Sequence, residues 1–165
     1  MNKNAFRQLS YGVYVISTWD EGRPTGCTAN SAMQITSEPA TIAVSINHDN
    51  YTNSCICKSN KFAISILSEK SLPLSIGMFG FRSGKDFDKF SQVPYRIVDG
   101  LPIIDDACGY LICEVVDKVE THSHTVFIAD VLNGDILNNN TPMTYAYYHN
   151  VIKGNSPKNA PTFIQ

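Results

Sequence analysis

The sequence is poor in charge and contains no long apolar run. Charged residues make up 17% of its 165 residues, and the formal net charge is −2. Proteins that bind nucleic acid or anionic membranes as their main task normally carry a basic surface, so we expect neither partner. No apolar run reaches the roughly 20 residues of a membrane-spanning helix. The N-terminus also has no apolar signal-peptide core, so the expected location is the cytoplasm.

Several common functional motifs are missing. No Gly-x-Gly-x-x-Gly follows a strand-like segment and no P-loop is present, which argues against both common nucleotide-binding folds. The Gly-x-Ser-x-Gly nucleophile elbow of the α/β-hydrolases is also missing.

The cysteines and histidines do not form a recognisable metal motif. The cysteine count is five, and the closest pair, Cys55 and Cys57, lacks the Cys-x-x-Cys spacing of zinc and redox sites. We therefore expect free thiols. His122 and His124 would share one face of a strand, but no cysteine or carboxylate motif completes a site, and we expect no bound metal.

The residues that are present favour one strand-rich domain. Hydrophobic residues make up 43% of the chain, enough for a substantial core. Short β-branched and aromatic segments recur, and few helical segments interrupt them. We predict a mainly β fold, an antiparallel barrel with a few covering helices, spanning 1–165. Residues 138–165 are expected to form a C-terminal extension that packs on the barrel or on a partner subunit. Strands are expected at 13–18, 26–36, 40–46, 61–67, 93–102, 108–119 and 125–132, and helices at 6–10, 51–58 and 68–80.

Three polar stretches break this pattern, at 28–31, 50–54 and 82–89. The first has small side chains that let a flat ligand approach the backbone, although a bulge or sheet edge would explain it as well. The second opens a predicted helix capped by Asn50 or Thr52, and a helix start can bind phosphate; capping alone is the alternative. Together they suit a ligand with a polar ring, a polyol and a phosphate. FMN fits that description, as do other phosphorylated ligands.

The third stretch lies within 79–90, where Arg82, Lys85 and Lys89 surround a Ser-Gly pair. Glycine allows close backbone approach, and cations complement phosphate. We interpret it as an anion-binding loop; the alternative is an exposed polar loop with Phe87 and Phe90 packed in the core.

Several motifs are spread along about the whole chain: Gly12-Val13-Tyr14-Val15, Thr28-Ala29-Asn30-Ser31, Glu38-Pro39, Ser45-Ile46, Asn50-x-Thr52, Arg82-Ser83-Gly84-x-Asp86-x-Asp88-Lys89-Phe90, Gly100-Leu101-Pro102, and His124 before Val126-Phe127-Ile128. They resemble the flavin reductase-like, FMN-binding split-barrel family. The C-terminal segment 153–162 is similar to the flavin domain of high-molecular-weight rubredoxins and related NADH:flavin oxidoreductases. Those proteins continue into a rubredoxin module, which this chain lacks, so an external acceptor is expected.

The resemblance implies a homodimeric split barrel with FMN at or near the subunit interface. His124 would lie near the ring or the nicotinamide; a hydrogen-bonded histidine at a strand start is the alternative. Ala129-Asp130 stands where the family often has Gly-Glu, a departure that could alter packing near the flavin. The ring and ribityl wall would comprise Thr28, Ala29, Asn30, Ser31, Ser45, Ile46 and Asn47, and the phosphate end Asn50, Thr52, Asn53, Arg82, Ser83, Lys85 and Lys89.

We therefore expect an NAD(P)H-dependent flavin reductase-like oxidoreductase. Bound FMN would take hydride from NADH or NADPH, and the electrons would pass to flavin, oxygen, ferric iron or a rubredoxin-like protein. One alternative is an FMN-binding electron-transfer protein that another redox protein reduces. Another is a non-enzymatic module of the same barrel that holds FMN or haem.

Overall fold

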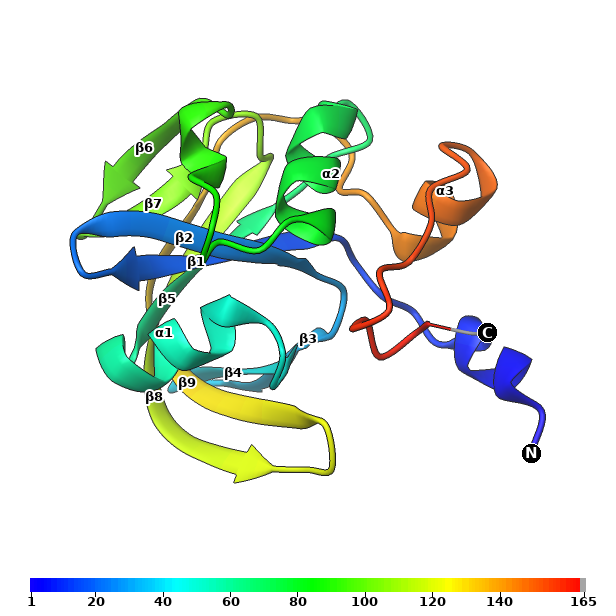
Figure 1. Cartoon of the computed structure of the whole chain (residues 1–165), viewed down its shortest axis with the longest axis horizontal. Helices are drawn as coiled ribbons and strands as arrows, with labels where there is room; N and C mark the ends of the chain where they lie inside the picture. The colour runs from blue at the N-terminus through cyan, green and yellow to red at the C-terminus, as the bar shows by residue number, and fades with distance from the viewer. Residues whose placement is uncertain (164–165) are drawn as a thin grey trace.

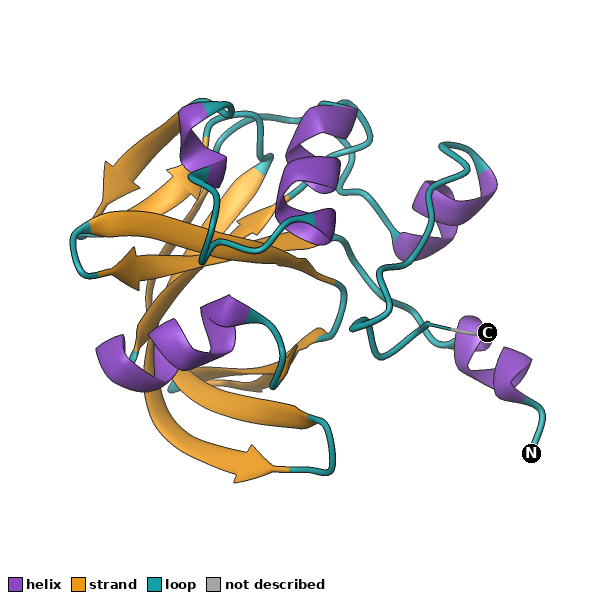
Figure 2. Ribbon diagram, viewed as in Figure 1, coloured by secondary structure: helices purple, strands orange, loops and turns teal. Residues whose placement is uncertain are grey.

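An antiparallel sheet of seven strands forms the body of the computed structural model, which describes residues 1–163 (Figures 1 and 2). The strand order is β2-β1-β5-β8-β9-β4-β3, and a separate hairpin of β6 and β7 packs against β1 and β5. The strands are β1 Tyr14–Asp20, β2 Arg23–Ala29, β3 Ala32–Ser37, β4 Ala40–Asn47, β5 Lys61–Ile66, β6 Tyr95–Val98, β7 Leu101–Ile104, β8 Gly109–Glu120 and β9 His124–Ile136. The helices are η1 Lys3–Gln8, α1 Tyr51–Ser59, α2 Pro73–Phe81, η2 Lys89–Ser91 and α3 Tyr145–Asn150.

The sheet curls around a shared interior. Ile16 of β1, Ile46 of β4 and Phe127 of β9 belong to one buried cluster, although β1 and β4 lie far apart in the strand order. Burial of each such side chain stabilises the fold by about 1.5–3 kcal/mol. Helix α1 adds Ile56 to the same cluster.

The sheet is open between β2 and β3, which are its two edges although they are consecutive in sequence. The sequence predicted one returning strand over 26–36, and this prediction is wrong. β2 pairs with β1 and ends at Ala29, whereas β3 pairs with β4, and Asn30 and Ser31 connect the two edges. An unclosed antiparallel barrel of this kind confirms the predicted fold class.

Strand β4 is fully buried on one face only. Its interior residues Ile42, Val44 and Ile46 are buried, but Ala43 and Ser45 on the opposite face are only half-buried. Next to β4 the edge strand β3 leaves Met33 and Ile35 exposed. The outer face of this part of the sheet is therefore open in a single chain.

Helix α2 begins later than its sequence predicts, and its cap comes from a distant part of the chain. Pro73 occupies the first turn, and the N-cap residue Leu72 has no side chain that can cap the helix. Instead a carboxylate oxygen of Asp106 accepts from the Leu72 N–H at 2.9 Å and from the Ser75 hydroxyl at 3.1 Å. None of the described helices is long and apolar enough to cross a membrane.

The C-terminal region packs on its own chain. Thr144 pairs with Gly12, and Met143, Tyr145 and Tyr148 join a core cluster with residues of β1 and α2. Tyr145 and Tyr148 belong to the short helix α3, which was not among the helices expected from the sequence. Beyond α3 the chain turns back toward the barrel (Figure 1).

Candidate functional site

A pocket of about 430 Å³ opens where β2, β4 and α2 end and α1 begins. This volume lies within the range of about 300–1,000 Å³ that small-molecule sites usually occupy. Its lining includes twelve of the predicted site residues, namely Thr28, Ala29, Asn30, Ser45, Ile46, Asn47, Asn50, Thr52, Arg82, Ser83, Lys89 and His124.

Two strand ends form a polar wall of the pocket. Thr28 to Asn30 close β2, and Ser45 to Asn47 close β4. The Thr28 hydroxyl donates to the Ile76 carbonyl oxygen at 3.1 Å, which ties β2 to α2. The wall thus comes from both sides of the gap in the barrel, and small side chains expose backbone there.

The start of α1 faces the same pocket. Asn50 is the N-cap residue, but its side chain makes no capping hydrogen bond, so it can turn to a ligand. The first N–H groups of a helix have no partners within the helix, and they favour an anion. Tyr51 and Thr52 follow, and both line the pocket.

Arg82 to Gly84 lie at the end of α2 and also line the pocket. Arg82 is exposed, and its guanidinium lies 4.8 Å from the centre of the Phe87 ring. An added Cβ on Gly84 would collide with Thr25 Oγ1, so this loop approaches β2 too closely for a larger residue. The loop is therefore held in place, and the exposed Arg82 remains available to contact a ligand.

Asp20 links the start of α1 to the loop at 82–84. Its carboxylate accepts from the Tyr51 hydroxyl at 3.0 Å and from Arg23 at 3.1 Å. Arg23 in turn donates to the Gly84 carbonyl oxygen at 2.7 Å. The start of α1 and the loop at 82–84 are thus joined through the β1–β2 hairpin.

Lys89 differs from the other predicted cations because it is buried. Its ammonium group donates to backbone carbonyl oxygens of Gly26 and Phe79, and burial lowers its pKa. Phe90 packs in the core, as the alternative interpretation of this loop expected, and Phe87 is half-buried. The loop therefore combines structural and pocket-facing residues.

Three predicted site residues lie outside the pocket lining. Lys85 is exposed, and the Ser31 hydroxyl donates to the Asn30 side chain at 3.0 Å. Asn53 is buried, and its amide donates to the Ile46 carbonyl oxygen and to Thr125, both at 3.0 Å. The side chains of Ser31 and Asn53 thus support neighbouring pocket residues.

His124 begins β9 beside the end of β4, opposite Asn47 in the strand register. Its Nδ1 lies 2.8 Å from the Ser123 hydroxyl, whereas its buried Nε2 has no hydrogen-bond partner. Burial lowers the pKa of His124, the backbone of Asn159 opposes this shift, and His48 reinforces it. A neutral imidazole with one unpaired nitrogen can exchange a hydrogen bond with a bound molecule.

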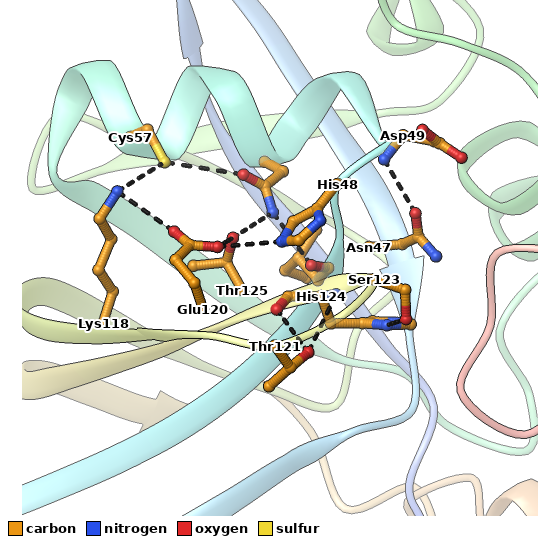
Figure 3. A network of polar contacts seen from close by, with 12 residues as sticks. Asn47, His48, Asp49, Cys57, Lys118, Glu120, Thr121, Ser123, His124 and Thr125 are labelled. Atoms are coloured by element: carbon orange, nitrogen blue, oxygen red, sulfur yellow. Dashed lines mark hydrogen bonds and ion pairs between the residues drawn. The ribbon is translucent and has the colours of Figure 1, made fainter.

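A polar network holds the β4–α1 turn against the β8–β9 hairpin (Figure 3). Glu120 accepts from Thr125 at 2.9 Å and lies 3.0 Å from His48 Nε2. Lys118 lies 3.4 Å from the same carboxylate and 3.8 Å from the Cys57 sulfur. The hydrogen bond from Thr125, together with those from His48 and Lys118, lowers the pKa of Glu120. This network fixes the turn that carries Asn47 and Asn50.

The sequence did not indicate the wall of the pocket formed by the C-terminal segment. Residues 155–161 line it together with Tyr145 and Tyr148. The segment has no periodic pattern, and its glycine and prolines indicated only irregular structure.

Within residues 1–163, no group of three or more His, Cys, Asp or Glu side chains is placed to hold a metal ion. No disulfide links the five cysteines, and burial raises the pKa of Cys113 to about 12.

The profile of the family described as "Flavin reductase like domain" matches residues 6–156. The chain belongs to this flavin reductase-like family. The predicted family and enzyme class, a flavin reductase-like oxidoreductase, are therefore confirmed.

Relatives agree with this assignment. A protein named high molecular weight rubredoxin from Moorella thermoacetica is 43% identical over 166 residues, which cover 99% of this chain and 72% of that protein. A ferric-chelate reductase (NAD(P)H) from Archaeoglobus fulgidus is 33% identical over 167 residues, covering 100% of this chain and 99% of that protein. The solved structure of flavin reductase PheA2 superposes with a TM-score of 0.75 at 32% identity, covering 86% of this chain and 89% of that one.

The residues of this flavin reductase-like pocket fit a flavin. Strand ends with small side chains offer backbone and amide groups to a flat ring, and His124 Nε2 is a buried polar atom without a partner. The open start of α1 and Arg82 supply the complement to a phosphate.

Proposed function

We propose that this protein binds FMN and uses it to transfer electrons from NADH or NADPH to an external acceptor. The observation that carries the proposal is the pairing of two ends in one pocket. One end has the uncapped start of α1 and Arg82, and the other has the unpaired Nε2 of His124.

In this proposal the α1 N–H groups, Asn50, Thr52, Arg82 and Ser83 hold the phosphate. The wall at 28–30 and 45–47 orients the ring through backbone and amide hydrogen bonds. The bound flavin supplies the redox chemistry itself, because it can accept hydride and release electrons singly or in pairs. His124 would hydrogen-bond the ring or the nicotinamide through Nε2. Because its imidazole is neutral at pH 7, Nε2 can act either as a donor or as an acceptor, depending on the tautomer.

Acceptors fall into several classes, and two relatives suggest some of them. One relative is named a ferric-chelate reductase (NAD(P)H) and another a high molecular weight rubredoxin. Ferric iron and a rubredoxin-like protein are therefore acceptors to test, besides free flavin and oxygen. The second name also favours a second candidate function, an electron-transfer protein that another redox protein reduces.

Anaerobic titration of the purified, FMN-loaded protein tests this function. We expect NADH or NADPH to bleach the flavin absorbance stoichiometrically, and added acceptor to restore it. Failure to take up FMN would overturn the proposal. Uptake of FMN without bleaching by either nucleotide, but with bleaching by reduced rubredoxin, would establish the electron-transfer alternative instead.

We also propose that the protein is a homodimer. The outer face of β3, β4 and β9 has a cross-strand row of Met33, Ala43 and Ile128, and Met33 is 66% exposed. Val119 of the adjacent strand β8 is also exposed. Exposed apolar side chains gathered on one sheet face are typical of an interface between subunits.

A further inference from the structure

The C-terminal segment 155–162 forms no helix or strand (Figure 2). Residues 155–161 all line the pocket, and Asn159 lies beside His124. The family profile ends at residue 156, so most of this wall lies beyond the matched region.

Thr162 fixes the far end of the segment. Its side chain is buried, with 7% of the residue exposed. The hydroxyl oxygen accepts from Asn30 Nδ2 at 2.8 Å and the hydroxyl donates to Tyr145 Oη at 2.8 Å. Since Asn30 Oδ1 accepts from Ser31, both ends of the Asn30 amide are then occupied. One hydroxyl thus joins the tail to the β2–β3 connection and to α3.

The near end of the segment is fixed by Tyr148. The Gly154 N–H donates to the Tyr148 carbonyl oxygen at 3.0 Å, and the Tyr148 hydroxyl donates to the Asn155 carbonyl oxygen at 3.1 Å. An added Cβ on Gly154 would collide with the Tyr148 ring. Ser156 contacts the Tyr145 hydroxyl, the same group that binds Thr162.

The middle of the segment is held more loosely than its ends. Between Pro157 and Pro161, the described backbone hydrogen bonds form two local turns. The Ala160 N–H donates to the Pro157 carbonyl oxygen at 3.0 Å, and the Phe163 N–H donates to the Ala160 carbonyl oxygen at 3.0 Å. A chain held at both ends and free in the middle can open by release of one end. Release of Thr162 breaks fewer contacts than release of the Tyr148 end, which is continuous with buried α3.

We propose that Thr162 is a positioning residue that latches the segment 155–162 across the pocket, and that this latch controls exchange of the bound flavin and seats the nicotinamide beside His124. The statement about flavin and nicotinamide rests on the proposed function, whereas the latch itself does not. The molecule that the closed segment retains is a flat, phosphorylated heteroaromatic ring, because the remaining walls fit that chemistry.

Thr162→Val tests the latch, because valine keeps the shape of threonine but cannot make either hydrogen bond. Thr162→Ser, which keeps the hydroxyl, is the rescue variant. Thr25→Val is the matched control, since it removes a buried hydroxyl that has no hydrogen-bond partner. Loss of the buried hydrogen bonds of the Thr162 hydroxyl is expected to raise the population of molecules with an open 155–162 segment by roughly five- to thirty-fold.

Amide hydrogen exchange of the protein without added flavin measures the latch. We expect exchange at 155–162 to accelerate five- to thirty-fold in Thr162→Val, with wild-type rates in Thr162→Ser and Thr25→Val. Exchange in β8 should stay unchanged, which distinguishes local opening from global unfolding. Equal exchange at 155–162 in Thr162→Val and wild type would overturn the proposal.

Stopped-flow release of FMN and steady-state kinetics measure the consequence. Thr162→Val is expected to release FMN faster by a similar factor and to raise KM for the nicotinamide, with kcat at saturation nearly unchanged. Faster exchange with unchanged FMN release would overturn the control of flavin exchange. If the wild type bound no FMN, the proposed function and this consequence would both fail, and amide exchange would still decide the latch.

Discussion

The ammonium group of Lys89 donates a hydrogen bond to the carbonyl oxygen of Gly26 at 2.6 Å, from inside the fold. A second bond, to Phe79 at 3.3 Å, joins the end of α2 to the same nitrogen. Lys89 therefore connects β2 and α2 to η2, while Arg82 at the end of α2 remains exposed.

Replacement of Lys89 by Met should destabilise the fold. It removes the charged donor from two backbone carbonyl groups, and hydrogen bonds of this kind contribute about 1.5–3 kcal/mol each to the free energy of unfolding. Urea unfolding of the flavin-free protein measures the change. Exposed Lys85→Met is the control and should stay within about 0.5 kcal/mol of wild type. Equal stability of the two variants would contradict the structural role of Lys89.

Replacement of Arg82 by Ala should weaken FMN binding and leave riboflavin binding unchanged, because riboflavin has no phosphate. We expect a loss of about 1.5 kcal/mol, or roughly tenfold in Kd, at the lower end of the range for charged hydrogen bonds because Arg82 is exposed. Fluorescence titration with both flavins gives the two constants. A parallel loss for riboflavin would indicate that Arg82 acts on the ring wall, and Lys85→Ala should change neither constant.

Two glycines near each other in sequence should respond in opposite ways to alanine. Gly77 lies within α2 and has no atom within 4 Å of an added Cβ, so Gly77→Ala should stabilise the fold by about 0.5–1 kcal/mol. Gly84→Ala should displace the loop from Thr25 and weaken FMN binding. Thermal unfolding and FMN titration of both variants check this, and wild-type FMN affinity in Gly84→Ala would show that the loop position is not critical.

Acid should destabilise the protein through His124. Its pKa in the folded protein is lowered below 6.5, chiefly by burial, so the unfolded chain takes up the proton first as the pH falls. The free energy of unfolding should therefore decrease below about pH 6.5, down to the lowered pKa. Urea unfolding between pH 5 and 8 should show a smaller decrease in His124→Gln. The same decrease in His124→Gln as in wild type would contradict the assignment to His124.

Met33→Asp tests the proposed homodimer. A carboxylate on the exposed row of β3 should prevent burial of that face and shift the protein to monomer in sedimentation equilibrium, without unfolding it. Glu38→Ala, at an exposed position just beyond β3, is the control. A monomeric wild type would reject the dimer, and a dimer that persists in Met33→Asp would place the interface elsewhere.

Much of the fold follows from local sequence pattern, whereas contacts between distant segments do not. The prediction of a strand at 61–66 was correct because the alternation of large apolar residues with small or polar ones is a local property of the sequence. The break at Asn30 and Ser31, which sends β3 to the opposite edge, depends on pairing with β4. The cap on α2 comes from Asp106, 34 residues beyond Leu72 along the chain.

The candidate site shows the same limit. Sequence composition selected the polar stretches that meet at the pocket, because small and polar residues interrupt strands there. It could not separate exposed Arg82 from buried Lys89, since both are cations in one glycine-containing loop. It also gave no sign that 155–161 would face the pocket, because an irregular segment is placed by single contacts such as that of Thr162.

The position of Thr162 also affects how the protein should be prepared. An affinity tag or fused domain attached shortly after this residue would begin next to the opening of the pocket and compete with the segment for its place. The 3₁₀ helix at Lys3–Gln8 buries no residue, so a tag there has little to disturb. Measurements of cofactor affinity and turnover are therefore best made on protein purified through its amino terminus.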